Sequence, residues 1–469
     1  MLGKVFKAYD VRATYPSPLT DDMAWQIGVG TAKYLLQQAE AQGQTTPMMK
    51  NIVVGHDMRK SSPALRDNLC QGIIDGGANV IDVGLVDTPF VYFAVNHLGC
   101  AGGVQVTASH NPSNYNGFKV SKQHAKPVGE STGLADIRKH AALADLRKKG
   151  ENKGYTDPKD LWDAYRKHVL QFCHTNGKKL KVAIDASNGM AGTMIPKVFG
   201  EKGEQVEGLE IIPLNFDNSS GEFVHEPNPL VASNLESLQQ LVKDSGADLG
   251  ICFDGDADRL VITDEHANII GCDHLTAFLA KDFLQRNPGS PIVYDLRSSK
   301  ALEEDVKAAG GKPVKSRVGH VFMKAALAEH GAAFGGELSG HFYFQQNFNA
   351  DSGAIALAET LTALAKADKP VSECLAPIAR YHQSGEINFE NEEKDEALEE
   401  LEASYEGRGE LDRLDGVTVD CFDKEGWWCN VRKSNTEPLL RLNLEARTPD
   451  LRDKMVAEIA PLLGEQVAH

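Results

Sequence analysis

Short apolar runs alternate with amphipathic stretches along the chain, and this alternation predicts strands followed by helices. Asn51-Ile52-Val53-Val54-Gly55 is the kind of run that is buried in a parallel sheet. Ser61-Ser62-Pro63 then opens a helix that continues to about Ile74, because serine caps a helix and proline suits its first position. The pattern continues with a strand at 79–83, a helix opening at Thr88-Pro89 and a strand at 102–106. This βαβαβ order predicts an α/β unit.

The same alternation restarts twice, and a module of different character ends the chain. The second unit has apolar runs at 181–185, 210–214 and 249–253, and the third begins at 260–263 and continues with the run 291–295. We place the joins in the polar stretch 148–160 and near Asp264. After a boundary within 369–383, strands are predicted at 386–389, 417–419, 427–431 and 439–444, with an acidic helix at 393–405 and a last helix from Asp450. The final module is therefore α+β.

Composition narrows the class of protein. Of 469 residues, 42% are hydrophobic and 25% are charged, which is typical of soluble chains with several domains of roughly 100–200 residues each. The net charge of −17 argues against nucleic acid as a partner, since binding to a phosphate backbone needs basic surface. We find no secretory apolar segment and no run near the ~20 apolar residues of a membrane-spanning helix. The eight scattered cysteines indicate buried thiols, so we expect a cytoplasmic protein without membrane contact, as a monomer or small homo-oligomer.

Four loops carry the residues of chemical interest, and each follows a predicted strand, which is where ligands bind in open α/β sheets. The first is Thr107-Ala108-Ser109-His110-Asn111-Pro112. A serine on a strand-end turn can project its hydroxyl into a cleft, although for this sequence alone an ordinary polar turn is the simpler explanation. The Gly-x-Ser-x-Gly motif of serine hydrolases occurs at 129–133, in a charged loop without a preceding strand, and we dismiss it.

The second loop places Asp254, Asp256 and Asp258 at alternate positions after an apolar strand. Carboxylates this close repel one another unless a hard cation joins them, and their oxygens suit Mg²⁺ or Ca²⁺ better than zinc. An EF-hand would place Glu265 at its last position, but Arg259 stands where that loop needs glycine and a strand follows instead of a helix. A solvated acidic turn is the other alternative, and the flanking apolar strands favour a metal site.

Two further loops suit a sugar phosphate. Gly335-Gly336-Glu337-Leu338-Ser339-Gly340-His341 offers carboxylate, hydroxyl and imidazole groups that could bind sugar hydroxyls, with a plain turn as the alternative. Arg432-Lys433-Ser434-Asn435-Thr436-Glu437-Pro438 offers a guanidinium, hydroxyls and an amide to a phosphate, with an ordinary hairpin loop as the alternative. No Gly-x-x-x-x-Gly-Lys-Ser/Thr or Gly-x-Gly-x-x-Gly motif is present, so nucleotide binding has no support.

Taken in order, the four loops resemble those of the α-D-phosphohexomutase superfamily over essentially the whole chain. Residues 107–112, continuing to Lys119, are similar to its phosphoserine loop, 254–259 to its metal loop, 336–341 to its sugar-binding loop and 432–438 to its phosphate-binding loop. Tyr9-Asp10-Val11-Arg12 and Arg317-Val318-Gly319-His320 also match, although Ala13 follows the first where the family has glycine. Asn435 resembles the phosphomannomutase/phosphoglucomutase branch, because phosphoglucosamine mutases usually have Ser-Gly-Thr in this loop.

The resemblance implies an α/β fold of three related mixed α/β domains and a C-terminal α+β domain around a central active-site cleft. Combined with the strand pattern, it predicts domains at 1–155, 156–262, 263–373 and 374–469, which carry the phosphoserine, metal, sugar-binding and phosphate-binding loops in that order.

The resemblance also implies a set of site residues and a reaction. Catalytic roles fall to Ser109, as a phosphoserine, and to Arg12, His110, Lys119, Arg259 and His341. Substrate contacts fall to Tyr9, Arg317, Gly319, His320, Lys324, Glu337, Ser339, Arg432, Ser434, Asn435 and Thr436, and Mg²⁺ falls to Ser109, Asp254, Asp256 and Asp258. The implied enzyme is an intramolecular phosphotransferase that interconverts hexose 1-phosphate and hexose 6-phosphate, of mannose or glucose, through a hexose 1,6-bisphosphate that also acts as activator.

Several alternatives stay open at this point. His341, Lys119 and Arg12 are all candidates for the general acid and base, and the sequence does not choose among them. A phosphoglucosamine mutase, a sugar phosphatase and a non-catalytic sugar-phosphate-binding protein are the competing functions. The phosphatase is disfavoured because the loop at Arg432 has no purpose in simple hydrolysis, and the binder because Ser109 and the aspartates are intact.

Overall fold

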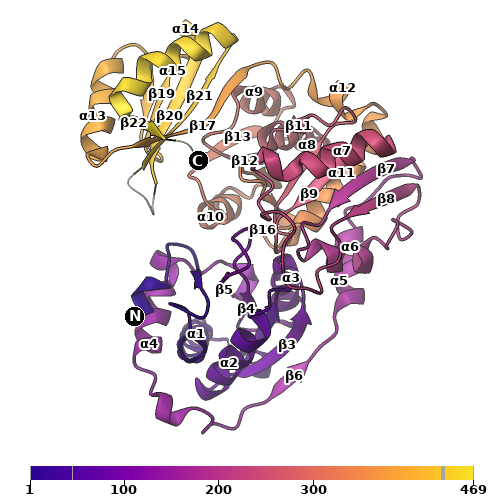
Figure 1. Ribbon diagram of the computed structural model, residues 1–469, viewed down its shortest axis with the longest axis vertical. Helices are drawn as coiled ribbons and strands as arrows, with labels where there is room; N and C mark the ends of the chain where they lie inside the picture. Colours follow the sequence, from indigo (N-terminus) through magenta and orange to yellow (C-terminus); the bar gives the residue numbers. More distant parts are fainter. Residues whose placement is uncertain (1, 45, 435–438, 468–469) are drawn as a thin grey trace. The chain divides into compact units, whose positions relative to one another are not determined.

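The computed structural model describes residues 2–44, 46–434 and 439–467. The chain forms two compact units, one of Met1–Cys272 with Ser339–Ser372 and the other of Asp273–Leu338 with Glu373–His469. Figure 1 follows the chain through both by colour, and each unit is described below by itself.

The first sheet of unit 1 is mixed, in the order β1-β5-β4-β2-β3-β6. Its strands are β1 (Val11–Thr14), β2 (Asn51–His56), β3 (Asn79–Leu85), β4 (Gly102–Val106), β5 (Tyr115–Lys122) and β6 (Thr156–Pro158). The helices are α1 (Asp21–Ala41), α2 (Ser62–Asp75), α3 (Thr88–Leu98) and α4 (Leu134–Ala142). Strand β2 pairs in parallel with β3 and β4, which confirms the predicted βαβαβ order. Its interior is wholly buried, as an apolar run in a parallel sheet must be.

The second sheet of unit 1 has the order β11-β10-β9-β7-β8. Its strands are β7 (Leu180–Asp185), β8 (Leu209–Leu214), β9 (Leu249–Phe253), β10 (Leu260–Thr263) and β11 (Ile269–Ile270), with helices α5 (Trp162–Leu170), α6 (Ala191–Val198) and α7 (Glu236–Ser245). Strand β10 pairs antiparallel with β9, so our prediction that 260–263 opens a third unit is wrong. Apolar periodicity marked the strand but could not show which sheet it joins, because a turn returns it beside β9. Unit 1 also contains β15 (Phe342–Phe344), β16 (Ala350–Asp351) and α11 (Gly353–Ala367).

Unit 2 contains a parallel group of strands and an antiparallel sheet. In the parallel group, β12 (Pro291–Asp295) lies between β13 (Lys312–Ser316) and β14 (Phe334–Gly336), with helices α9 (Lys300–Ala308) and α10 (His320–His330). Helix α8 (Cys272–Arg286) precedes it, and α12 (Val371–Leu375) leads to the C-terminal part.

The C-terminal sheet of unit 2 has the order β18-β19-β20-β21-β17-β22. Its strands are β17 (His382–Glu390), β18 (Glu410–Asp412), β19 (Val417–Asp420), β20 (Trp427–Lys433), β21 (Leu439–Ala446) and β22 (Glu465–Val467), with α13 (Lys394–Tyr405), α14 (Phe422–Glu425) and α15 (Pro449–Leu463). Leu401 of α13 and Ile459 of α15 share a core with Val419, Leu442 and other inward side chains of the sheet. Figure 1 shows α13 and α15 beside this sheet at the orange-to-yellow end of the chain. The α+β prediction for this module is confirmed.

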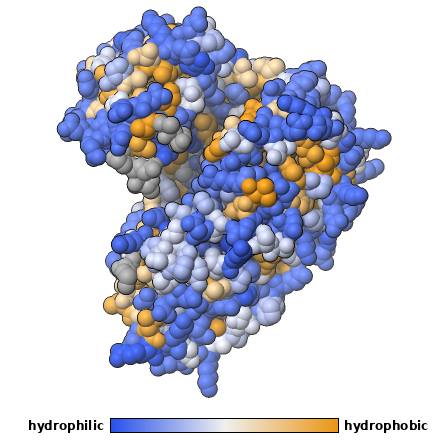
Figure 2. Space-filling model, in the orientation of Figure 1, coloured by the Kyte–Doolittle hydropathy of each residue, from blue (hydrophilic) through white to orange (hydrophobic). Residues whose placement is uncertain are grey.

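The face of the molecule in Figure 2 is mostly hydrophilic, with apolar side chains in small groups. Among the residues that the structure describes, every helix is too short or too polar to cross a membrane.

Candidate active site

The Ser109 loop begins at the carboxyl end of β4, an inner strand of the first sheet, as predicted. Ser109 is buried and has a φ of 52°, a left-handed conformation that is unusual for a residue with a side chain. Its Oγ donates a hydrogen bond to Asp254 Oδ2 over 2.8 Å and lies 3.3 Å from Nδ1 of His110. The backbone N–H of Ser109 donates to Oγ1 of Thr107. The hydroxyl therefore projects from its turn onto the acidic loop of the second sheet, which an ordinary polar turn does not require.

A buried arginine that the sequence analysis missed holds this loop in place. The Arg59 side chain is fully buried and pairs with Asp57 over 3.0 Å. Its two terminal nitrogens donate to four backbone carbonyls of the loop, those of Ser109, Asn111, Pro112 and Tyr115. Asp57 in turn accepts from Thr107 Oγ1 over 2.7 Å. Asp57 and Arg59 directly follow β2, so the strand-end rule that selected Ser109 could have found them.

The acidic loop spans the turn between β9 and β10. Asp254, Asp256 and Asp258 are all buried and bring carboxylate oxygens within 4.8 Å of one another. Gly255 allows the loop to lie close to Ser109, because a Cβ there would stand 2.4 Å from the Ser109 carbonyl oxygen. Burial, followed by Asp258 and Asp256, raises the pKa of Asp254 well above its ordinary value. Oδ1 of Asp256 is buried without a hydrogen-bond partner among the described residues, so this donor set fits a hard cation.

Cationic side chains surround the acidic loop. Nζ of Lys119 lies 2.7 Å from Asp256 Oδ2 and 2.5 Å from Asp258 Oδ2. Burial works against ionisation of Asp258, yet Lys119 and His341 outweigh it and hold its pKa well below the ordinary value. Nε of Arg259 lies 3.8 Å from Asp254 Oδ2. This balance of charge keeps three buried carboxylates together, as a site for a cation and a phosphate requires.

Arg12 and His110 flank Ser109. Arg12 donates to Oδ1 of Asn111 over 2.6 Å and pairs with Asp10. Burial, and then Arg259 and Arg12, lower the pKa of His110 well below its ordinary value, so its imidazole is neutral at pH 7. Tyr9 lies on the bend before β1, where it is partly exposed.

His341 joins the same cluster from the segment that precedes β15. Its Nδ1 lies 2.9 Å from Oγ of Ser339, and its Nε2 lies 3.3 Å from Asp258 Oδ1 and 3.8 Å from Asp351 Oδ2. Asp351 was not among the predicted residues, since an acidic residue on a short strand gives no signal in the sequence. Unit 1 thus brings together Ser109, the three aspartates, Arg12, His110, Lys119, Arg259, Ser339 and His341.

Unit 2 holds the remaining predicted residues in two groups. In the first, Glu337 is buried, and its Oε1 accepts a hydrogen bond from the Gly319 N–H over 2.8 Å. The Arg317 guanidinium lies over the Phe322 ring, 4.2 Å from its centroid. His320 begins α10, and Lys324 is buried one turn further along this helix.

The second group of unit 2 gathers positive charge around one carboxylate. Arg432 donates to Glu386 Oε2 over 2.8 Å, Arg441 donates to Oε1 over 3.0 Å, and Arg297 lies 3.5 Å away. Burial and the neighbouring Arg297 lower the pKa of Arg432. Arg297 also pairs with the buried Asp295 over 2.9 Å, so three guanidinium groups face two carboxylates. One positive charge remains in excess, which suits a phosphate. Ser434, two residues after Arg432 in the sequence, is buried. Asn435 and Thr436 lie outside the described residues.

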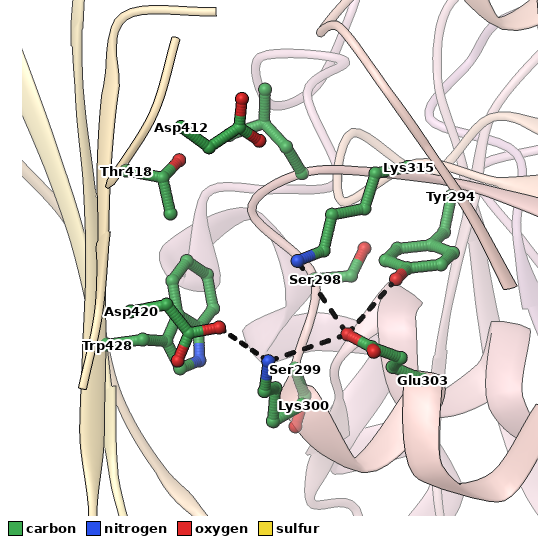
Figure 3. A pocket seen from close by; sticks show the side chains of 11 residues that line it. Tyr294, Ser298, Ser299, Lys300, Glu303, Lys315, Asp412, Thr418, Asp420 and Trp428 are labelled. Carbon is green, nitrogen blue, oxygen red and sulfur yellow. Dashed lines mark hydrogen bonds and ion pairs between the residues drawn. The ribbon is translucent and has the colours of Figure 1, made fainter. Parts of the chain in front are cut away.

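A small cavity of unit 2 lies apart from all the predicted site residues. Figure 3 shows it between the β12–α9 segment and the C-terminal sheet, where Lys300 points to both Asp420 and Glu303. The Lys300 and Asp420 charges are 2.6 Å apart, and Lys315 and Tyr294 also reach Glu303. The enclosed volume is about 10 Å³, roughly the room for one water molecule. We therefore interpret the cavity as part of a polar contact between two parts of unit 2 and not as a substrate site.

Comparison with protein families matches nearly the whole chain, in four consecutive parts. Residues 3–147, 163–268 and 272–381 match the phosphoglucomutase/phosphomannomutase alpha/beta/alpha domains I, II and III. Residues 386–462 match the C-terminal domain of the same family.

Individual relatives cover the chain equally well. The phosphomannomutase of Escherichia coli K12 is 36% identical over 450 residues, which is 94% of each chain. A Xanthomonas campestris pv. campestris protein with the name "Phosphohexose mutases" is 37% identical over 463 residues, which is 98% of each chain. Among solved structures, a phosphoglucomutase/phosphomannomutase family protein from Burkholderia thailandensis has a TM-score of 0.84 at 29% identity, covering 98% of this chain and 96% of its own.

Proposed function

Because the chain belongs to the phosphoglucomutase/phosphomannomutase family, we propose that it moves a phosphoryl group between O1 and O6 of mannose or glucose through a phosphorylated Ser109. The chain is a phosphohexose mutase, an intramolecular phosphotransferase. We propose mannose or glucose as the sugar, a hexose 1,6-bisphosphate as the intermediate, and the residue roles given below. We keep the predicted division into four domains at 1–155, 156–262, 263–373 and 374–469, except that the second domain must extend past Ile270, because β10 and β11 pair within its sheet.

One contact carries the proposal: the hydrogen bond of 2.8 Å from Ser109 Oγ to Asp254 Oδ2. It joins the proposed phosphoryl carrier to the acidic loop, from a different sheet and 145 residues away. Mg²⁺ would be held by Asp254, Asp256, Asp258 and a Ser109 phosphate oxygen, and when bound it supplies a Lewis-acid charge beside that phosphate. Phosphoryl transfer depends on such positioning and charge more than on covalent work by the protein.

The protein side chains supply the rest of the environment. Lys119 and Arg259, which contact the acidic loop, and Arg12, which contacts Asn111 of the Ser109 loop, would neutralise phosphoryl oxygens at Ser109. His341, which contacts Ser339 and Asp258, Lys119 and Arg12 stay the candidates for moving the proton of the substrate hydroxyl. Glu337 and Ser339 would bind sugar hydroxyls, and Tyr9, Arg317, Gly319, His320 and Lys324 would make further contacts with the substrate. Arg432, with Ser434, Asn435 and Thr436, would bind the phosphate that is not being transferred.

The test supplies mannose 1-phosphate or glucose 1-phosphate with Mg²⁺ and a catalytic amount of hexose 1,6-bisphosphate. We expect the 6-phosphate to appear with the native chain and with Ser131→Ala, an exposed serine in the dismissed hydrolase-like motif, but not with Ser109→Ala. Release of free phosphate instead of the 6-phosphate would indicate a phosphatase. Equal turnover by the Ser109→Ala chain would remove Ser109 as the phosphoryl carrier.

A further inference from the structure

The two carboxylate oxygens of Asp256 have different surroundings. Oδ2 accepts a hydrogen bond of 2.5 Å from Oγ1 of Thr88 and one of 2.7 Å from Nζ of Lys119. Oδ1 is buried and has no hydrogen-bond partner among the described residues. Burying a carboxylate oxygen without a hydrogen-bond partner costs free energy, so the surrounding residues must hold the Asp256 carboxylate in this orientation.

Thr88 is placed to enforce it. It is fully buried at the first position of α3, and its backbone N–H donates to the backbone carbonyl of Asp256 over 3.1 Å. With the hydroxyl bond to Oδ2, Thr88 therefore fixes both the main chain and the side chain of Asp256. Lys119 makes only the side-chain contact, and it is shared with Asp258.

The direction of the Thr88 hydroxyl is not explained by its own helix. A threonine near a helix N-terminus commonly accepts a hydrogen bond from an N–H one turn along, but Thr88 Oγ1 is the donor to an aspartate 168 residues away in sequence. Asp87, which precedes the helix, makes no capping bond either, and it accepts from the hydroxyl of Tyr165 over 2.8 Å. The start of α3 is thus held between α5 and the acidic loop.

We propose that Thr88 is a positioning residue for the metal, which holds the Asp256 carboxylate so that Oδ1 is presented to the cation. The inference rests on the metal site proposed above. If the hydroxyl is removed, the carboxylate keeps Lys119 as a partner but loses the bond that sets its rotation. The chain should then bind a divalent cation more weakly while its fold is kept.

The experiment measures Mn²⁺ binding by electron paramagnetic resonance to the full-length chain, after metal has been removed with a chelator. Thr88→Val has nearly the shape of threonine without the hydroxyl, and Thr88→Ser keeps the hydroxyl. We expect Thr88→Val to weaken Mn²⁺ binding by about tenfold, the equivalent of one hydrogen bond to a charged group, and Thr88→Ser to bind within about twofold of the native chain. The circular dichroism spectrum should be unchanged in both.

Asp256→Asn, measured in parallel, separates this inference from the metal site on which it rests. If Asp256→Asn and Thr88→Val both bind Mn²⁺ as the native chain does, the metal site itself fails. If Asp256→Asn weakens binding and Thr88→Val does not, Thr88 has no positioning role. Weak binding by Thr88→Ser equal to that of Thr88→Val would also overturn the role, since the hydroxyl would not be the cause. Should Thr88→Val not fold, Thr88→Ala carries the same comparison.

Discussion

Replacing Arg59 by methionine should loosen the Ser109 loop more than any surface substitution in its sheet. The change removes the ion-pair partner of the buried Asp57 and the donors to four backbone carbonyls, while it keeps most of the side-chain volume. Breaking a buried ion pair by removing one partner costs about 3–5 kcal/mol. The carbonyl bonds lie in the same network, so their loss is contained in that figure and is not added to it.

Hydrogen exchange followed by mass spectrometry measures this effect in place. Peptides that cover 102–120 report the opening of β4, the Ser109 loop and β5, and a loss of about 3–5 kcal/mol corresponds to exchange roughly 100- to 4000-fold faster. Arg147→Met is the matched control, because Arg147 pairs with Asp145 on the surface and is 90% exposed. Exchange in the Arg59→Met chain that matches the Arg147→Met control would refute the inference that Arg59 holds the loop.

Three further predictions concern other parts of the chain. Arg432→Ala should raise KM for the hexose phosphate by roughly 10- to 150-fold, because it removes a charge-assisted contact of about 1.5–3 kcal/mol. The variant should also release more bisphosphate into solution, and an unchanged KM would count against phosphate binding by Arg432. The hydrogen bond to Asp185 raises the pKa of His225, so its stabilising effect is full below the unfolded pKa of about 6.5 and is lost as pH rises through the folded pKa. His225→Gln should therefore lower Tm more at pH 6 than at pH 8.5, and the opposite order in calorimetry would contradict the sign. Lys300→Met, which leaves Asp420 without its 2.6 Å partner, should lower the stability of unit 2 by about 1 kcal/mol, and a loss that does not shrink in 1 M salt would exclude an electrostatic cause.

Part of the fold was predictable because inner strands such as β2 and β4 are buried on both faces. The runs at 51–55, 79–83 and 102–106 appear as β2, β3 and β4 with ends extended by at most two residues. In contrast, the sequence predicts only a loop where β5 (Tyr115–Lys122) lies, because polar and apolar positions are mixed there. The strand forms through pairing with β1 and β4. The sheet to which 260–263 belongs was misjudged for the same reason, since pairing is a long-range property.

The site was predictable where chemistry and strand ends coincide in sequence. Ser109 and Asp254 were selected in this way, and the structure brings their side chains into contact. Arg59 and Thr88 also follow strands, but a single arginine or threonine there has many ordinary explanations. Their partners lie 50 and 168 residues away, so only the folded chain reveals them.

In the proposed reaction, Ser109 carries the phosphoryl group between two positions of one sugar. The direct measurement loads the full-length chain with radiolabelled phosphate from hexose 1,6-bisphosphate, removes the excess, and mixes it with unlabelled glucose 1-phosphate or mannose 1-phosphate in a rapid-quench instrument. We expect label on the peptide that contains Ser109 before mixing, label in the sugar fraction within a single turnover, and no label taken up by Ser109→Ala. Label on another residue, or label that passes directly to free phosphate, would contradict the proposed reaction.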